Sequence, residues 1–214
     1  MRSRLAFGLL ICFASISPAA SAAAAEEPSN VEMRSIFDAD QGVRSDSTAF
    51  YKNAARIASD DAARRARTRQ LLDSGQLRTG DDFSEAAFVF QHGDKPTDFL
   101  LAHTLAVVAV AKGRSDASWI AAATLDRYLQ TIGQPQIYGT QYKANWPVTA
   151  GKPDMSKAAP TQEPYDRILV PDALRQALHV PTLKEQEARR AEMERELRAQ
   201  QPLSPSLSGP TVKN

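Results

Sequence analysis

The stretch FLLAHTLAVVAVA at residues 99–111 decides the fold. It is apolar on every side except at His103 and Thr104, a pattern typical of a helix buried at the centre of a bundle. A bilayer-spanning helix needs about 20 apolar residues, so this stretch is too short to cross a membrane. We therefore expect a central, buried helix near residues 98–112.

Helical patterns flank this stretch on both sides. Upstream, an apolar repeat ends at His92-Gly93, where glycine can adopt the left-handed conformation that closes a helix. Downstream, Ser115 can cap a helix that stops at Gly133. Because the links are short, neighbouring helices should be antiparallel. The predicted trio spans residues 82–92, 98–112 and 115–132.

Further helices are predicted outside the trio. An Ala- and Arg-rich segment without Pro or Gly predicts one long helix over residues 46–73. Just upstream, Asp38-Ala39-Asp40-Gln41 matches a capping box. Near the C-terminus, a short helix over residues 172–179 precedes a charged helix over residues 184–201. That last helix has little apolar surface, so we expect it to project from the body.

These patterns predict an all-α fold of antiparallel helical hairpins. Packed hairpins also suit a fragment of a helical-repeat array, although no recurring period establishes one. Scattered prolines among Gly, Lys and Ser predict a long irregular loop before the C-terminal helices. The expected organisation is a signal peptide at 1–25, a helical core at 31–142, an irregular connection at 143–164, a helical segment at 165–201 and a disordered tail at 202–214.

The N-terminus predicts export. Arg2 and Arg4 precede an apolar run, and small residues with the sequence Ala20-Ser21-Ala22 follow it. Cleavage is expected near residue 22 or 25, which places the mature protein in a periplasm or outside the cell. No transmembrane helix is expected in the mature chain. The single cysteine, Cys12, lies in the segment removed, so no disulfide is expected.

Charge excludes some partners. Removing Arg2 and Arg4 leaves 24 basic residues against 25 acidic ones, a formal net charge near −1. Nucleic-acid binders carry a basic patch or stripe, and this chain shows none, so nucleic acid is not expected as a partner. The expected partner is a small molecule or an envelope protein, with no cofactor. The sequence sets no oligomeric state.

Polar residues on otherwise apolar helices are candidates for a site. His103 and Asp126 lie on neighbouring antiparallel helices, within reach of each other. Such a pair can serve catalysis or can simply satisfy a buried histidine. Gln91-His92 ends the preceding helix, where His92 can also interact with the last helix carbonyls.

The segment QPQIYGTQY at residues 134–142 has two interpretations. It can be a strap, with Ile137 and Tyr138 packed over the helices and its glutamines bonded to helix-end carbonyls. Alternatively, its glutamines can bind an amide or a sugar, because each offers a donor and an acceptor. The strap is slightly favoured.

Catalytic alternatives have less support. His92, His103 and Asp126 make a minimal metal set without a recognised spacing, so no metal site is predicted. No serine sits in a G-x-S-x-G turn, which argues against serine hydrolase chemistry. Asp38, Asp40 or Asp126 paired with a histidine could act as acid and base on a sugar or an amide.

Several motifs together resemble a group of uncharacterised bacterial proteins that share a domain of unknown function. The resemblance covers about residues 37–142 and implies that the polar motif residues belong to one site. The motifs are Phe37-Asp38-Ala39-Asp40-Gln41, Phe90-Gln91-His92-Gly93, Leu101-Ala102-His103, Leu125-Asp126-Arg127 and Gly133-Gln134-Pro135-Gln136-Ile137-Tyr138-Gly139-Thr140-Gln141.

The leading hypothesis is an exported binding or interaction module with a polar pocket. The alternatives are a hydrolase that acts on envelope material through His and Asp groups, and a purely structural helical scaffold. The expected ligand-binding residues are Gln91, His92, His103, Asp126, Arg127, Gln136, Tyr138 and Gln141.

Overall fold

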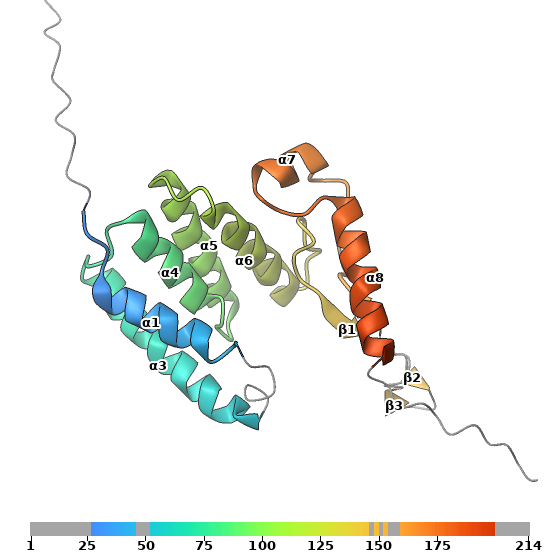
Figure 1. The fold of residues 1–214 in the computed structure, drawn as a ribbon, viewed down its shortest axis with the longest axis horizontal. Coiled ribbons are helices and arrows are strands. Elements are labelled where there is room, and N and C mark those ends of the chain that lie inside the picture. Colours follow the sequence, from blue (N-terminus) through green and yellow to red (C-terminus); the bar gives the residue numbers. More distant parts are fainter. Residues whose placement is uncertain (1–26, 46–51, 146–147, 150–151, 154–158, 200–214) are drawn as a thin grey trace, which may run out of the picture.

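The computed structural model describes residues 27–45, 52–145, 148–149, 152–153 and 159–199. Within these residues the protein is mostly helical, which confirms the all-α prediction (Figure 1). The expected signal peptide and tail, and the first residues of the helix predicted at 46–73, lie outside the described residues.

The helical core is built from consecutive hairpins. Helices α4, α5 and α6 pack in succession, and α1 and α3 pack against α4 (Figure 1). Side chains such as Met33, Leu71 and Ile120 fill the interior between them. The core helices are α1 (Val31–Gly42), α3 (Ala54–Asp73), α4 (Gly80–Phe90), α5 (Pro96–Ala111) and α6 (Ala117–Thr131).

Helix α1 corrects the capping prediction. Its N-cap is Asn30, whose side chain accepts a hydrogen bond from the Met33 amide at 2.9 Å. The residues Asp38-Ala39-Asp40-Gln41 therefore lie in the second half of a helix and cap nothing. The capping box of this region is instead at the start of α4, between Thr79 and Asp82.

Two expectations for the central trio also change. Helix α5 is not buried all round, because α4 and α6 cover only part of it and leave Leu100 and Val107 40% and 48% exposed. Gly93 does not adopt a left-handed conformation. A glycine is required there because a Cβ atom would collide with the Asp98 side chain.

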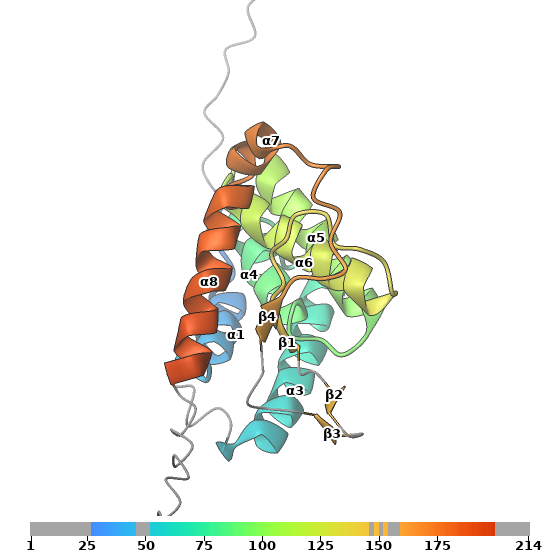
Figure 2. The same ribbon diagram turned by 90° about the vertical axis from the view of Figure 1, so that its right-hand side faces the viewer.

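The C-terminal part contains short strands as well as helices. Strand β1 (Lys143–Asn145) pairs antiparallel with β4 (Ala159–Thr161), and β2 (Val148–Thr149) pairs antiparallel with β3 (Lys152–Pro153). The connection predicted as irregular is thus partly paired. Helices α7 (Asp172–Ala177) and α8 (Leu183–Ala199) follow and lie beside α6 and the segment after it (Figure 2).

Helix α8 is attached near its N-terminal end rather than projecting entirely. Gln186 is only 3% exposed, and its carbonyl accepts a hydrogen bond from the Tyr142 hydroxyl at 3.2 Å. The other α8 residues are exposed or half-buried. No helix in the described part of the chain combines the length and apolar character that crossing a membrane requires.

Candidate functional site

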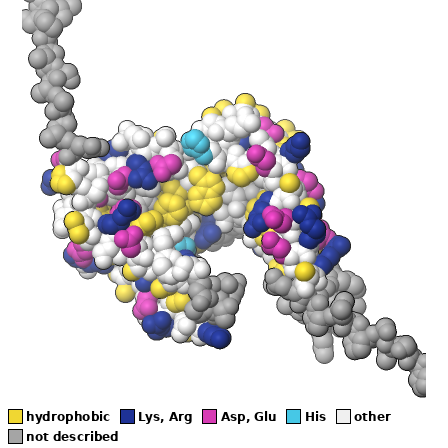
Figure 3. Space-filling view, viewed as in Figure 1, with side chains coloured by type: hydrophobic (Ala, Val, Ile, Leu, Met, Phe, Trp, Pro, Cys, Tyr) yellow, Lys and Arg dark blue, Asp and Glu magenta, His cyan; other side chains and the backbone are white. Residues whose placement is uncertain are grey.

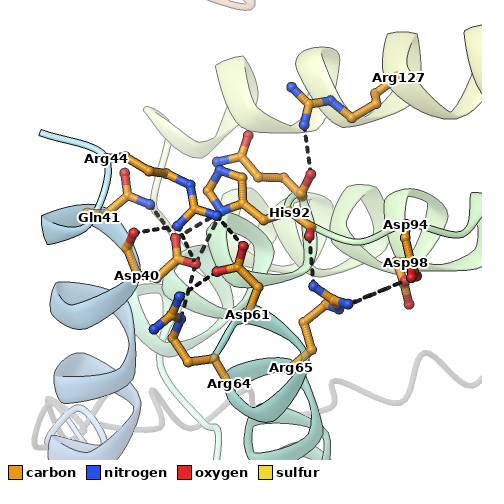
Figure 4. A network of polar contacts seen from close by, with 11 residues as sticks. Asp40, Gln41, Arg44, Asp61, Arg64, Arg65, His92, Asp94, Asp98 and Arg127 are labelled. Carbon is orange, nitrogen blue, oxygen red and sulfur yellow. Dashed lines mark hydrogen bonds and ion pairs between the residues drawn. The ribbon is translucent and has the colours of Figure 1, made fainter. Parts of the chain in front are cut away.

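A buried carboxylate organises a polar cluster where α1, α3 and the end of α4 meet. Asp40, in the last turn of α1, is fully buried. It accepts a hydrogen bond from Gln41 Nε2 at 2.7 Å and lies 3.0 Å from His92 Nδ1. Arg44 Nη1 is 3.2 Å from the same carboxylate. Asp40 therefore fixes the orientation of the His92 ring (Figure 4).

A second carboxylate balances the arginines of this cluster. Asp61 on α3 accepts hydrogen bonds from Arg44 Nη2 at 2.7 Å and from Arg64 Nη2 at 2.5 Å. Burial alone would raise the pKa of Asp61, but the two guanidinium groups hold it below its ordinary value. Arg44 and Arg64 thus have anionic partners inside the protein.

Two further arginines hold the end of α4 by its backbone. Arg65 donates to the His92 carbonyl at 2.7 Å, and Arg127 on α6 donates to the Gln91 carbonyl at 2.8 Å (Figure 4). Arg65 is also 4.0 Å from the carboxylates of Asp94 and Asp98. The consecutive carbonyls of Gln91 and His92 are therefore each held by an arginine.

Arg127 differs from the other arginines of the cluster. Its remaining contacts are Gln141 Oε1 at 3.1 Å and the Phe99 ring, whose centroid is 5.7 Å away. Among the described residues, no carboxylate lies within ion-pair distance of it. Burial lowers the pKa of Arg127, and the like charge of Arg44 lowers it further. The side chain is half-buried, so it keeps part of its hydration, but it has no carboxylate to offset the part that it loses.

Three polar groups at this place keep atoms without a partner in the described part of the chain. They are Nε2 of His92, Nη2 of Arg127 and the side-chain amide of Gln91. The His92 side chain is 17% exposed. We call Arg44, Gln91, His92 and Arg127, with Asp40 behind them, the arginine–histidine site. It offers hydrogen-bond donors, and Arg127 is its arginine without a carboxylate partner among the described residues.

Asp126 has a different role. One carboxylate oxygen accepts from the amides of Ile137 and Tyr138 at 2.8 and 2.9 Å. The other accepts from the amide and the hydroxyl of Thr140 at 2.9 and 2.8 Å. The carboxylate is thus fully used in shaping residues 134–142, which we call the strap.

The strap glutamines also bind the chain itself. Gln136 is fully buried, donates to the Gln141 carbonyl at 3.0 Å and accepts from the Gln141 amide at 3.0 Å. Gln141 Nε2 donates to the Ala123 carbonyl of α6 at 3.1 Å. The Tyr138 carbonyl accepts from Gln186 Nε2 at 2.8 Å and from the buried Arg175. These contacts match the strap interpretation in part: Gln141 bonds a carbonyl of α6, whereas Gln136 bonds the backbone of Gln141 and Gln162 rather than a helix end.

His103 stands apart from both groups. Its Nδ1 atom lies 2.9 Å from the Ala121 carbonyl. No hydrogen bond or ion pair within the described part of the chain joins it to Asp126, so the expected pairing is wrong. His103 contacts a backbone carbonyl of α6 instead, and Asp126 accepts hydrogen bonds from backbone amides of the strap. Of the candidate residues, the structure brings together Gln91, His92, Arg127 and Gln141, and it places Asp126, Gln136 and Tyr138 in the strap.

Sequence reasoning missed the supporting charges of the site. In the sequence, Asp40 fits an acid partner of a histidine, but the pattern Asp38-Ala39-Asp40-Gln41 favours a helix cap. Arg44, Asp61 and Arg64 gave no local signal, because charged residues on an amphipathic helix usually face water. The sequence did contain one signal of these ion pairs. Asp40 and Arg44, and likewise Asp61 and Arg64, are about one helical turn apart.

No family model matches the chain, and neither the curated proteins nor the solved structures contain a match. Within the described residues, no three His, Cys, Asp or Glu side chains are grouped so that they could hold a metal ion.

Proposed function

We propose that the protein is a binding module that holds a small anionic ligand at the arginine–histidine site. The observation that supports this most directly is Arg127, a half-buried guanidinium with no carboxylate partner among the described residues. An anion beside it would supply the missing counter-charge. Charge-assisted hydrogen bonds from arginine to carboxylate or phosphate are also roughly twice as strong as neutral ones.

A thermal-shift panel tests this proposal. Phosphate, citrate and a neutral sugar are added to the wild type and to Arg127→Gln, with Arg190→Gln as the control. Arg190 is paired with Glu187 on the surface of α8, so it represents an arginine that already has its partner. An anion at about 100 times its Kd should stabilise the wild type by about 2.7 kcal/mol. Arg190→Gln should keep that shift and Arg127→Gln should lose it. Equal shifts in all three proteins would contradict the proposal.

A second candidate function is hydrolysis with His92 as general base. It is favoured by the Asp40 carboxylate on Nδ1, which fixes the tautomer and leaves Nε2 to take a proton from water. Chromogenic esters, amides and phosphodiesters are the test substrates, with envelope polymers as the expected natural class. His92→Gln should abolish turnover, and Asp40→Asn should reduce it at least about tenfold. Anion binding without turnover would leave only the first proposal.

We also propose that the protein is exported and belongs to the group of bacterial proteins that its motifs resemble. Support comes from the two arginines and the apolar run at the N-terminus. Mass spectrometry of the protein recovered from its native cells should show an N-terminus near residue 23 or 26. An intact N-terminus would contradict export by this route.

A further inference from the structure

A groove follows helix α8 on the side that faces the strap. Its larger part is a cavity of about 600 Å³, and a smaller part of about 210 Å³ lies nearer the end of α8. Tyr142 and Arg189 line both parts, so the two are continuous. Figure 3 shows the molecule hollowed between the helical core and α8, with apolar side chains lining part of the hollow.

The walls of the groove combine aromatic and aliphatic side chains with polar ones. Trp119, on α6, is 39% exposed and lines the larger cavity together with Pro181. Pro160, Met193 and Leu197 line the smaller one. A large aromatic side chain left open in a groove is typical of a binding surface.

Glu185, Arg189 and Glu196, which line the groove, have partners within the described part of the chain, whereas Lys143 at the smaller cavity has none there. Glu185 accepts hydrogen bonds from the amide and the hydroxyl of Thr182, both at 2.7 Å. Arg189 is 2.6 Å from Glu192. The larger cavity, whose charged side chains Glu185 and Arg189 are both paired, therefore suits an uncharged, partly apolar occupant better than an ion.

The chain itself supplies an occupant of this kind. Residues 200–214 follow directly after Ala199, and the smaller cavity reaches Leu197, next to that point. Residues 201–212 contain no charged side chain. Pro202 and Pro205 are three residues apart, which is one turn of a polyproline II helix. Such segments bind aromatic-lined grooves and need no backbone hydrogen bonds of their own.

The length of the tail also fits. From Leu197 back to Glu185 the groove follows 12 residues of α8, or about 18 Å at 1.5 Å per residue. About six residues of polyproline II, at about 3.1 Å each, cover that distance. The 15 residues after α8 are enough to reverse direction and to fill the groove.

We propose that residues 202–208 bind in the α8 groove of the same chain as an extended, proline-rich segment. The segment covers Trp119 and the wall formed by Tyr142. Any other ligand of this groove must first displace it. This site is separate from the arginine–histidine site and does not depend on the function proposed there.

Tryptophan quenching in the full chain tests the proposal. The chain has two tryptophans, so Trp146→Phe leaves Trp119 as the reporter. In that background, Pro202→Gly, Leu203→Ser and Pro205→Gly are combined to remove the polyproline preference. Quenching of Trp119 by acrylamide should become about twofold more efficient, because the segment no longer covers the ring. Val212→Ser, beyond the covered length, is the control and should leave quenching unchanged. Equal quenching with the native and the altered tail would overturn the proposal.

A cross-linking experiment identifies the chain that supplies the segment. A photo-cross-linking residue in place of Ser204 should form products with peptides that contain Tyr142 or Arg189. These products should lie within one chain and should not depend on protein concentration. Products between chains would overturn the intramolecular assignment, and cross-links to neither peptide would overturn the docking itself.

Discussion

The strap and the arginine–histidine site are both rich in polar side chains, but they use them in opposite ways. In the strap, the side chains of Asp126 and Gln136 form hydrogen bonds with the chain's own backbone. At the arginine–histidine site, Arg127 lacks an anionic partner and His92 keeps one nitrogen free within the described residues. The comparison teaches that a polar cluster points to a ligand only when its groups are not already satisfied.

The largest expected effect is on the strap. Asp126→Ala removes the acceptor of three backbone amides and leaves these partly buried groups without that partner. We expect the free energy of unfolding to fall by about 3–5 kcal/mol, measured by urea denaturation. Asp38→Ala, which changes an exposed aspartate of α1, is the control and should cost less than about 0.5 kcal/mol. A loss below about 1 kcal/mol in Asp126→Ala would show that the strap does not depend on this carboxylate.

Asp82 extends the comparison to a second backbone-binding aspartate. It accepts from the amides of Asn30, Arg78 and Thr79 at 2.7, 2.8 and 2.9 Å. Burial alone would raise the pKa of Asp82, but these donors hold it below its ordinary value. We expect Asp82→Asn to cost about 2 kcal/mol at pH 7, measured by urea denaturation.

The pH dependence of this loss has a definite sign. Because the pKa of Asp82 is lower in the folded state, its stabilising effect is complete above the unfolded value of about 3.9. The effect disappears as the pH falls through the folded value. The difference between wild type and Asp82→Asn should therefore shrink below about pH 4. A difference that stays constant from pH 6 to pH 2.5 would contradict this assignment.

Gln141 lies on the border between the two regions and gives a smaller, mixed effect. Its side chain donates to the Ala123 carbonyl and accepts from Arg127 Nε. Gln141→Ala should lower the free energy of unfolding by about 1–2 kcal/mol. It should also weaken anion binding by less than about tenfold, because Arg127 keeps its bond to the Gln91 carbonyl. Binding as weak as in Arg127→Gln would place Gln141 in the site itself.

The limits of the central trio of core helices could be predicted from the sequence, but most of the tertiary contacts between the elements could not. Helices α4, α5 and α6 begin and end within a few residues of their predicted limits, because apolar periodicity and glycine stops are local signals. Helix α1 was missed because Asp38-Ala39-Asp40-Gln41 imitates a cap, whereas the actual cap is Asn30. The remaining features, the polar cluster around Asp40 and the attachment of α8, depend on tertiary contacts. Asp40 meets His92 only because α1 packs beside α4, and Gln186 attaches α8 to a strap far away in sequence.

Calorimetric titration with inorganic phosphate tests the central claim most directly. It compares the wild type with Arg127→Gln, which alters the site, and with Gln134→Ala, which alters an exposed glutamine of the strap. We expect phosphate to bind the wild type and Gln134→Ala with equal affinity, and Arg127→Gln at least about tenfold more weakly, a loss of about 1.4 kcal/mol. Equal affinity in Arg127→Gln, or no binding to the wild type, would contradict the claim that this site holds an anion.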